Sequence, residues 1–270
     1  MLSARKQVVF ITGASSGIGK VTAEYLAERG FKVYGTGRSP KRARRSYSLL
    51  PMDVCDSESI KKAVEGILAE EGRIDVLINN AGMGITGPLE DTPTEEMKRV
   101  FDTNFFGPIE VMKAVLPSMR RQKRGLIINI TSIAGYMGLP FRGIYSATKG
   151  ALELITESSR MELKGFGIEV TNIAPGDFST NIAAGRYHAP LFENSPYKEV
   201  YQKSLELMDS HVDQGGDPIK MAKKIHQVIQ MPAPAVRYKV GAFMQKFSIV
   251  LKRVLPSKVY EKLLMNHYKL

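Results

Sequence analysis

The sequence contains a single cysteine, Cys55, among its 270 residues. One cysteine cannot form an intramolecular disulfide, and scarce cysteine is typical of reducing compartments, so we expect a cytoplasmic protein. No apolar run approaches the ~20 residues that a membrane-spanning helix needs. The first residues lead directly into an apolar run, without the longer apolar core and cleavage site of a secretory signal. These absences argue against a disulfide scaffold, a secreted protein and an integral membrane protein.

Metal-binding and nucleic-acid-binding patterns are also missing. The four histidines are scattered, at positions 188, 211, 226 and 267, without the spacing of metal ligands. Lys and Arg number 38 against 27 Asp and Glu, which gives a net charge of +11. Such an excess suits nucleic acid, an anionic membrane surface or an anionic cofactor. No interleaved aromatic residues accompany the basic clusters at 38–45, 120–124 and beyond 237, so we do not expect nucleic-acid binding.

Apolar, strand-like runs alternate with helical patterns through most of the chain. We expect strands at 7–12, 31–36, 48–52, 74–79, 125–131, 167–173 and 236–240. We expect helices at 17–29, 57–71, 94–121, 145–164 and 217–230. This βαβ alternation predicts a doubly wound, Rossmann-like α/β fold with about seven parallel strands and helices on both faces of the sheet. The nearly continuous apolar strands are typical of a sheet that is covered on both sides.

The chain has no internal repeat or low-complexity linker, so we expect one domain over residues 1–241. Residues 176–216 have little periodicity and many turn formers, which is typical of a lid or binding segment. Residues 242–270 alternate apolar with basic side chains and predict a C-terminal extension of two amphipathic helices divided at Pro256. Such an extension can lie on a membrane surface, or pack against the domain or a second subunit. These alternatives stay open.

Glycines follow the first expected strand, in the run Thr12-Gly13-Ala14-Ser15-Ser16-Gly17-Ile18-Gly19. Glycine allows sharp turns and lets phosphate oxygens approach backbone N–H groups, and the positive end of the next helix attracts a pyrophosphate. The spacing differs from G-x-G-x-x-G, and a tight turn without a ligand is the alternative. The position directly after the first strand favours a dinucleotide site at Gly13, Ser15, Ser16, Gly17, Ile18 and Gly19.

No acidic residue follows the second expected strand, where proteins that bind NAD usually place one to hold the ribose 2′-hydroxyl. The tip of this strand is Gly35-Thr36-Gly37-Arg38-Ser39-Pro40-Lys41. The Arg38 guanidinium is suited to pair with a 2′-phosphate through charge-assisted hydrogen bonds. A solvated basic turn is the alternative. The pattern favours NADP(H) over NAD(H).

Four polar residues along the chain are suited to proton transfer. Tyr145 and Lys149 are four residues apart, so they share one face of the expected helix. A nearby cation favours the phenolate and lowers the pKa of a tyrosine. Ser132 follows an expected central strand, at the sheet edge where open parallel sheets bind ligands. Asn104 lies in a long helical segment. The alternatives are an exposed Tyr–Lys pair, a capping serine and an ordinary helix asparagine.

Taken together, these residues resemble the short-chain dehydrogenase/reductase family, from roughly residue 7 to residue 241. Thr12 to Gly19 is similar to the family's cofactor loop, and Asn104, Ser132, Tyr145 and Lys149 match its catalytic tetrad. The resemblance implies further cofactor contacts at Asp53, Val54, Asn80, Ala81, Gly82, Tyr145, Lys149, Pro175, Gly176 and Thr180. Ser16 departs from many NADP-preferring members, which carry Arg or Lys there, so the NADP prediction depends mainly on Arg38.

The resemblance implies hydride transfer between a nicotinamide cofactor and a ketone, aldehyde or alcohol. Tyr145 would give its proton to the developing alkoxide, and Ser132 would hydrogen-bond the same oxygen. Lys149 would lower the pKa of Tyr145 and hold the nicotinamide ribose. Asn104 would anchor a water for proton resupply, and Thr180 would orient the carboxamide. The resemblance also implies a homodimer or homotetramer.

The expected substrate pocket is largely apolar. The stretch between Ser132 and Tyr145 has few polar residues, and the lid segment adds Phe178, Ile182, Tyr187, Leu191 and Phe192. Such a pocket suits a lipophilic substrate, namely a steroid, a retinoid or a long-chain 3-keto lipid. The alternatives are a reductase of small polar or carrier-bound 3-oxoacyl carbonyls, and a regulator that senses NADP(H) without turnover. We expect a cytoplasmic oxidoreductase, with peripheral membrane contact through 242–270 as one option.

Overall fold

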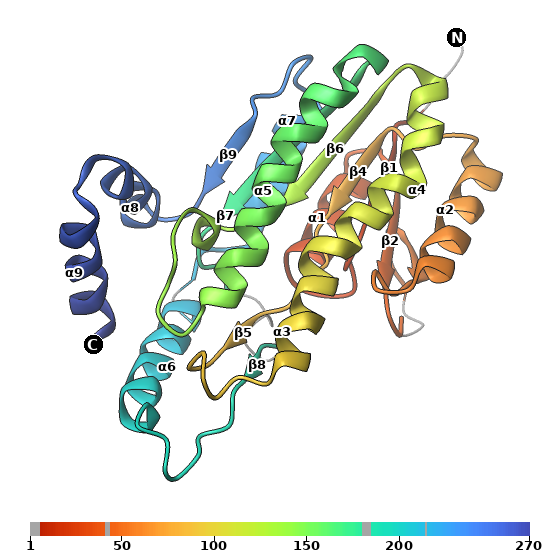
Figure 1. The fold of residues 1–270 in the computed structure, drawn as a ribbon. Helices are drawn as coiled ribbons and strands as arrows, with labels where there is room; N and C mark the ends of the chain where they lie inside the picture. Colours follow the sequence, from red (N-terminus) through yellow and green to blue (C-terminus); the bar gives the residue numbers. More distant parts are fainter. Residues whose placement is uncertain (1–5, 41–43, 180–184, 214) are drawn as a thin grey trace.

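A computed structural model describes residues 6–40, 44–179, 185–213 and 215–270, without the side chains of 209–213. Its centre is a sheet of seven parallel strands: β1 (Val8–Ile11), β2 (Lys32–Gly37), β3 (Ser48–Pro51), β4 (Val76–Asn79), β6 (Gly125–Ile130), β7 (Ile168–Pro175) and β9 (Arg237–Val240). The strands follow the spatial order β3-β2-β1-β4-β6-β7-β9 (Figure 1). The expected doubly wound parallel sheet is confirmed.

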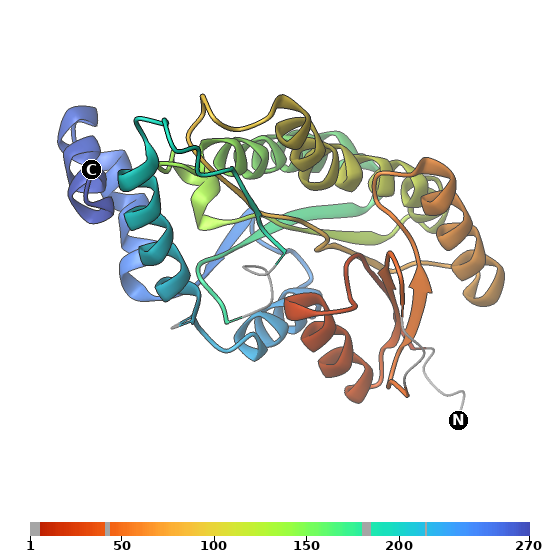
Figure 2. The ribbon, with the colours of Figure 1, turned by 90° about the horizontal axis from the view of Figure 1, so that it is seen from below.

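Helices cover both faces of this sheet (Figure 2). One face carries α1 (Gly17–Glu28) and α7 (Ile219–Ile229), whose apolar side chains share a core with β1 and β4. The other face carries α2 (Ser57–Glu71) and α4 (Gly107–Gln122), which form a second core with the same strands, and α5 (Gly143–Leu163), which packs on β7. Because both faces are covered there, the central strands β1, β4 and β6 are buried along their whole length.

The helix expected over 94–121 is interrupted. The structure has α3 (Thr94–Phe101), a π-helical segment over Asp102–Phe106, and then α4. A π turn adds one residue to a helical turn and is frequent at functional sites. Asn104 lies inside this segment and is fully buried. The interruption therefore fixes the direction of a predicted site residue.

The segment 176–216 contains more regular structure than its weak periodicity predicts. Helix α6 (Lys198–Asp213) lies in it, and β8 (Tyr187–His188) pairs in parallel with β5 (Ile85–Thr86). Short 3-10 turns cover Ile133–Tyr136 and Lys164–Phe166. A lid role for the segment stays a prediction, and Ile182 lies outside the described residues.

The C-terminal extension forms α8 (Phe243–Val254) and α9 (Ser257–Tyr268), so the two helices expected on either side of Pro256 are present. Ile249 and Tyr260 are buried in a third apolar cluster with Ile133, Met137 and Ala174 of the main domain. The extension therefore packs on the domain, beyond the end of β9 (Figure 1). In the part of the chain that is described, none of the helices combines the length and apolarity needed to cross a membrane.

Candidate active site

The glycine-rich turn after β1 has the backbone geometry of a phosphate-binding loop. Gly13 and Gly17 have positive φ angles of 66° and 56°. A Cβ atom on Gly13 would lie 2.8 Å from Ala81 Cα, so a side chain is excluded there. Ser16 makes no side-chain cap at the start of α1, and the first turn of the helix carries no acid. The positive end of α1 therefore remains available to an anionic group.

Neighbouring polar groups fix this loop in place. The Asn80 side-chain amide donates to the carbonyls of Thr12 and Gly13, both at 3.0 Å. The backbone N–H groups of Asn80 and Ala81 donate to Thr12 Oγ1 at 3.0 Å. The Asn80 amide therefore holds the loop in place, and its expected contact with the cofactor stays a prediction. Thr12 positions the segment that begins at Asn80. It belongs to the glycine-rich motif but was not among the residues expected to form the site.

The end of β2 lies directly against the glycine loop. Ala14 N donates to Thr36 O at 2.7 Å, and a Cβ on Gly37 would lie 2.9 Å from Ser15 Cβ. Arg38 follows and is exposed. Within the described residues it forms no ion pair. The guanidinium is therefore free to reach a phosphate beside the loop.

Asp53 and Val54, which follow β3, have local structural partners. Asp53 Oδ1 accepts a hydrogen bond from Cys55 N at 2.9 Å, and Asp53 N donates to Ser59 Oγ at 3.1 Å. Val54 is buried, and a Cβ on Gly107 would lie 3.0 Å from it. These contacts shape the chain after β3, where the resemblance implies cofactor contacts at Asp53 and Val54.

Ser132, Tyr145 and Lys149 converge at the carboxyl ends of the central strands. Ser132 lies two residues beyond β6, and its Oγ accepts from Ala134 N at 3.1 Å. Ser132 and Tyr145 line the same cavity. Lys149 lies one turn along α5, and its Nζ lies 6.0 Å from the centre of the Tyr145 ring. The Lys149 ammonium donates to Ile130 O at 3.0 Å.

Asn104 lies on the other side of Lys149. Its Oδ1 accepts from Met83 N at 2.8 Å, and its Nδ2 donates to Met83 O at 2.9 Å and Thr148 Oγ1 at 3.2 Å. A Cβ on Gly82 would lie 3.2 Å from Asn104 Oδ1 and 3.4 Å from Lys149 Nζ. Gly82 is therefore the spacer between these two side chains. All four residues of the predicted tetrad meet in one region.

The electrostatics of the site differ in one respect from the expectation. Burial raises the pKa of Tyr145, while a hydrogen bond with Ser132 and the nearby Arg142 and Arg186 guanidinium groups lower it to a smaller extent. Burial also lowers the pKa of Lys149 to about 8. Burial thus outweighs the groups that lower the pKa of Tyr145, and the main lowering contributions come from Ser132, Arg142 and Arg186 rather than from Lys149.

A cavity of about 740 Å³ extends from Ser132 and Tyr145 toward the C-terminal helices. Apolar side chains from the turn after β6 and from α8 and α9 line much of it: Ile133, Met137, Leu139, Met244, Leu251, Tyr260, Leu263 and Leu264. Of the apolar lid residues expected in the lining, Phe178 is present, whereas Leu191 and Phe192 are exposed on the surface. The extension, whose part in the pocket was not expected, supplies an entire wall.

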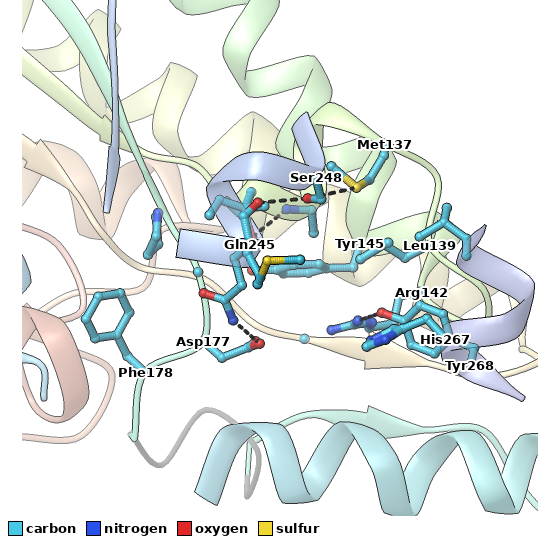
Figure 3. A pocket seen from close by; sticks show the side chains of 18 of the residues that line it. Met137, Leu139, Arg142, Tyr145, Asp177, Phe178, Gln245, Ser248, His267 and Tyr268 are labelled. Atoms are coloured by element: carbon cyan, nitrogen blue, oxygen red, sulfur yellow. Dashed lines mark hydrogen bonds between the residues drawn. The ribbon is translucent and has the colours of Figure 1, made fainter. Parts of the chain in front are cut away.

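Polar groups occupy two sides of this cavity (Figure 3). On one side, Gln245 of α8 donates through Nε2 to Asp177 Oδ2 at 2.6 Å, next to Pro175 and Gly176. On the other side, the Arg142 guanidinium donates to the Tyr268 hydroxyl. Thr180, expected to orient the carboxamide, lies outside the described residues. Among the described residues, no cluster of His, Cys, Asp or Glu is arranged to hold a metal ion.

Comparison with known proteins identifies the family. A family model described as short chain dehydrogenase matches residues 7–190. A 3-ketodihydrosphingosine reductase of Bacteroides thetaiotaomicron is 42% identical over 263 residues, 97% of this chain and 98% of the relative. Human retinol dehydrogenase 8 is 34% identical over 257 residues, 87% of this chain and 82% of the relative. The chain belongs to the short-chain dehydrogenase family and is an oxidoreductase of that family.

Solved structures agree on the fold. A short-chain dehydrogenase from Streptomyces avermitilis has 31% identity and a TM-score of 0.79, covering 97% of this chain and 98% of the other. ElxO with NADP bound has 27% identity and a TM-score of 0.71, over 87% and 97%. A member from Burkholderia phymatum in complex with NAD has 22% identity and a TM-score of 0.80, over 94% and 95%. The fold thus accommodates either nicotinamide dinucleotide.

Proposed function

We propose that this protein is an NADP(H)-dependent reductase of a long-chain, lipophilic ketone. The observation that carries the proposal is the cavity of about 740 Å³, largely apolar in its lining, into which Tyr145 and Ser132 face. Its volume lies within the range of small-molecule sites, ~300–1,000 Å³. Residues 1–241 would form the catalytic domain, and the extension would complete the substrate wall.

The residues present fit a dinucleotide cofactor. The side-chain-free loop at Gly13, the uncapped start of α1 and the carboxyl ends of the strands form one continuous edge. Arg38 and Ser15 would hold the 2′-phosphate, which is the reason for preferring NADP(H). A bound nicotinamide dinucleotide supplies the hydride in the reductive direction. Lys149 would hold its ribose.

Tyr145 would act as the proton donor. A tyrosine is protonated at neutral pH, and burial raises the pKa of Tyr145 further, so a proton is available when negative charge develops on the carbonyl oxygen. Ser132 would donate a second hydrogen bond to that oxygen and stabilise the alkoxide. The Lys149 ammonium, with a pKa of about 8, would then return a proton toward Tyr145. Asn104 would position the water that resupplies it, since the π-helical segment directs its amide to this side.

The polar groups of the cavity favour an amphipathic substrate. Arg142, Arg186 and Asp177 all lie close enough to Tyr145 to influence its pKa, whereas Leu251, Leu263 and Leu264 line the part beside α8 and α9. A long-chain 3-keto lipid has this polarity: a polar head next to the ketone and an apolar chain beyond it. The named activity of the Bacteroides relative, 42% identical, supports the same substrate class.

Assembly into a homo-oligomer is a further part of the proposal. Leu154 and Met161 are two helical turns apart on α5, so they lie on the same face of the helix. Their exposed fractions are 69% and 74%. A second copy of the chain packed on this face would remove both apolar side chains from water, which favours association. Light scattering of the purified protein tests this, and a monomer at all concentrations would contradict it.

A substrate panel tests the proposed activity. Purified protein is mixed with NADPH and, in turn, a long-chain 3-keto lipid, retinaldehyde, a ketosteroid, a carrier-bound 3-oxoacyl group and a short polar ketone. We expect the highest kcat/KM for the long-chain ketone. The Tyr145→Phe variant should lose ~10²- to 10⁴-fold in kcat while it binds NADPH as the wild type does. Turnover of small polar ketones alone, or an unchanged rate in Tyr145→Phe, would contradict the proposal.

A further inference from the structure

Helix α8 has an apolar stripe that faces away from the protein. Phe243, Phe247, Val250 and Val254 follow the spacing i, i+4, i+7 and i+11, so they lie on one face of the helix. All four are exposed, Phe243 by 71% and Val254 by 73%, and the two phenylalanine rings stack at 5.7 Å. Ile249, on another face, is buried against the domain. Helix α8 therefore has two apolar faces: one packs on the domain through Ile249, and the stripe faces outward.

Helix α9 repeats this arrangement. Val259 and Leu263 are exposed at i and i+4, and Leu270 is exposed just beyond the end of the helix, while Tyr260 is buried. Apolar side chains of this size are usually covered in a folded protein, and a contiguous exposed set marks an interaction site. Both C-terminal helices thus present apolar side chains outward.

Basic residues accompany the exposed apolar side chains. The segment 242–270 contains six Lys or Arg residues and a single acid, Glu261. The six basic side chains are exposed: Lys246, Lys252, Arg253, Lys258, Lys262 and Lys269. On a helical projection, Lys246 and Arg253 lie beside the Phe243 stripe. Apolar residues flanked by lysine and arginine are typical of helices that lie in the surface of an anionic bilayer.

The same two helices line the substrate cavity. Met244 and Leu263 line the cavity and are also exposed, Met244 by 66%. The cavity wall and the outward stripe are thus neighbouring faces of α8 and α9. A lipid in a bilayer that contacts the stripe would lie next to Met244 and Leu263, which reach both the surface and the cavity.

We propose that the outward face of α8 and α9 docks on an anionic lipid membrane surface, with the mouth of the substrate cavity toward the lipid. Docking itself follows from the exposed residues alone, whereas the delivery of substrate rests on the proposed function. A second copy of the chain fits this face less well. A symmetric contact would bring six basic side chains of one copy against six of the other.

Vesicle binding tests the docking. The full-length protein with bound NADPH is sedimented with phosphatidylcholine vesicles that contain or lack phosphatidylglycerol. We expect binding to the anionic vesicles and little to the neutral ones. The double variant Phe243→Ser/Phe247→Ser should bind at least about tenfold more weakly. The triple variant Lys246→Gln/Lys258→Gln/Lys262→Gln should lose on the order of 100-fold, since each basic residue contributes about fivefold. None of these residues lines the cavity.

Leu89→Ser is the matched control, because Leu89 is an apolar side chain that is 75% exposed and belongs to neither α8 nor α9. It should bind vesicles as the wild type does. Equal binding to neutral and anionic vesicles, equal losses in the control, or a dimer that the Phe243→Ser/Phe247→Ser variant converts to monomer would each overturn the proposal.

Turnover separates this proposal from the proposed function. The double phenylalanine variant should reduce a detergent-dissolved long-chain ketone at the wild-type rate and a vesicle-held ketone more slowly. If the wild-type protein reduces neither the detergent-dissolved nor the vesicle-held ketone, the proposed substrate is rejected, and the vesicle-binding result still tests the docking separately. Equal rates of wild type and variant on the vesicle-held ketone would overturn delivery from the membrane.

Discussion

Replacing Lys149 by methionine should stabilise the folded protein while it removes the activity. Lys149 is 5% exposed, and burial lowers the pKa of its ammonium group from 10.5 to about 8. At about 1.4 kcal/mol per pKa unit, holding this charge in the folded state costs roughly 3 kcal/mol. The variant also loses the hydrogen bond to Ile130 O, worth about 1 kcal/mol. We therefore expect a net gain of about 2 kcal/mol in the free energy of unfolding at neutral pH.

The pH dependence of this gain has a definite sign. Because the folded pKa of Lys149 lies below the unfolded one, the cost is fully present below about pH 8 and disappears as the pH rises toward 10.5. Urea unfolding of wild type and Lys149→Met, without nucleotide, should thus differ at neutral pH and converge between about pH 8 and 10.5. The exposed Lys98→Met is the control and should change nothing. A variant less stable than wild type at neutral pH, or a difference independent of pH, would refute the reasoning.

Three further substitutions test the cofactor site and the cavity wall. Arg38→Ala should weaken NADPH binding by about 10- to 100-fold and leave NADH nearly unchanged, as measured by nucleotide fluorescence; equal losses would contradict a 2′-phosphate contact. Asn80→Ala removes the donor to the Thr12 and Gly13 carbonyls, so it should lower the free energy of unfolding by about 1–3 kcal/mol; unchanged urea unfolding would argue against the positioning role. Gln245→Ala removes the hydrogen bond to Asp177 in the cavity, so it should raise KM for the long-chain ketone severalfold and leave kcat for a short ketone unchanged; an unchanged KM for the long-chain ketone would contradict a role of Gln245 in substrate binding.

The sheet and most helices could be predicted from the sequence because local patterns determine them. Seven apolar runs separated by amphipathic helical patterns leave few alternatives to a parallel sheet covered on both faces. The interruption at Asp102–Phe106 left no such signal, because its residues continue the helical pattern on both sides. Helix α6 was missed because its apolar side chains are few and the turn formers around it dominate the pattern.

The tetrad was predictable because its members occur in fixed order at the ends of elements. Ser132 after β6 and the Tyr145–Lys149 spacing on α5 need only the fold to bring them together. The pKa of Tyr145 was not predictable, because its direction depends on burial, which requires the packed structure. The two roles of α8 and α9 were not predictable for the same reason. The sequence shows amphipathic helices, but not that one face closes the cavity and another faces outward.

Transfer of deuterium from labelled NADPH tests the central claim most directly. The protein is incubated with a long-chain 3-keto lipid and NADPH that carries deuterium at the hydride position, and the product alcohol is analysed by mass spectrometry. We predict one deuterium on the carbinol carbon with wild-type protein, and product formation slower by ~10²- to 10⁴-fold with Tyr145→Phe. An unlabelled alcohol, or a labelled product formed equally by Tyr145→Phe, would contradict the account.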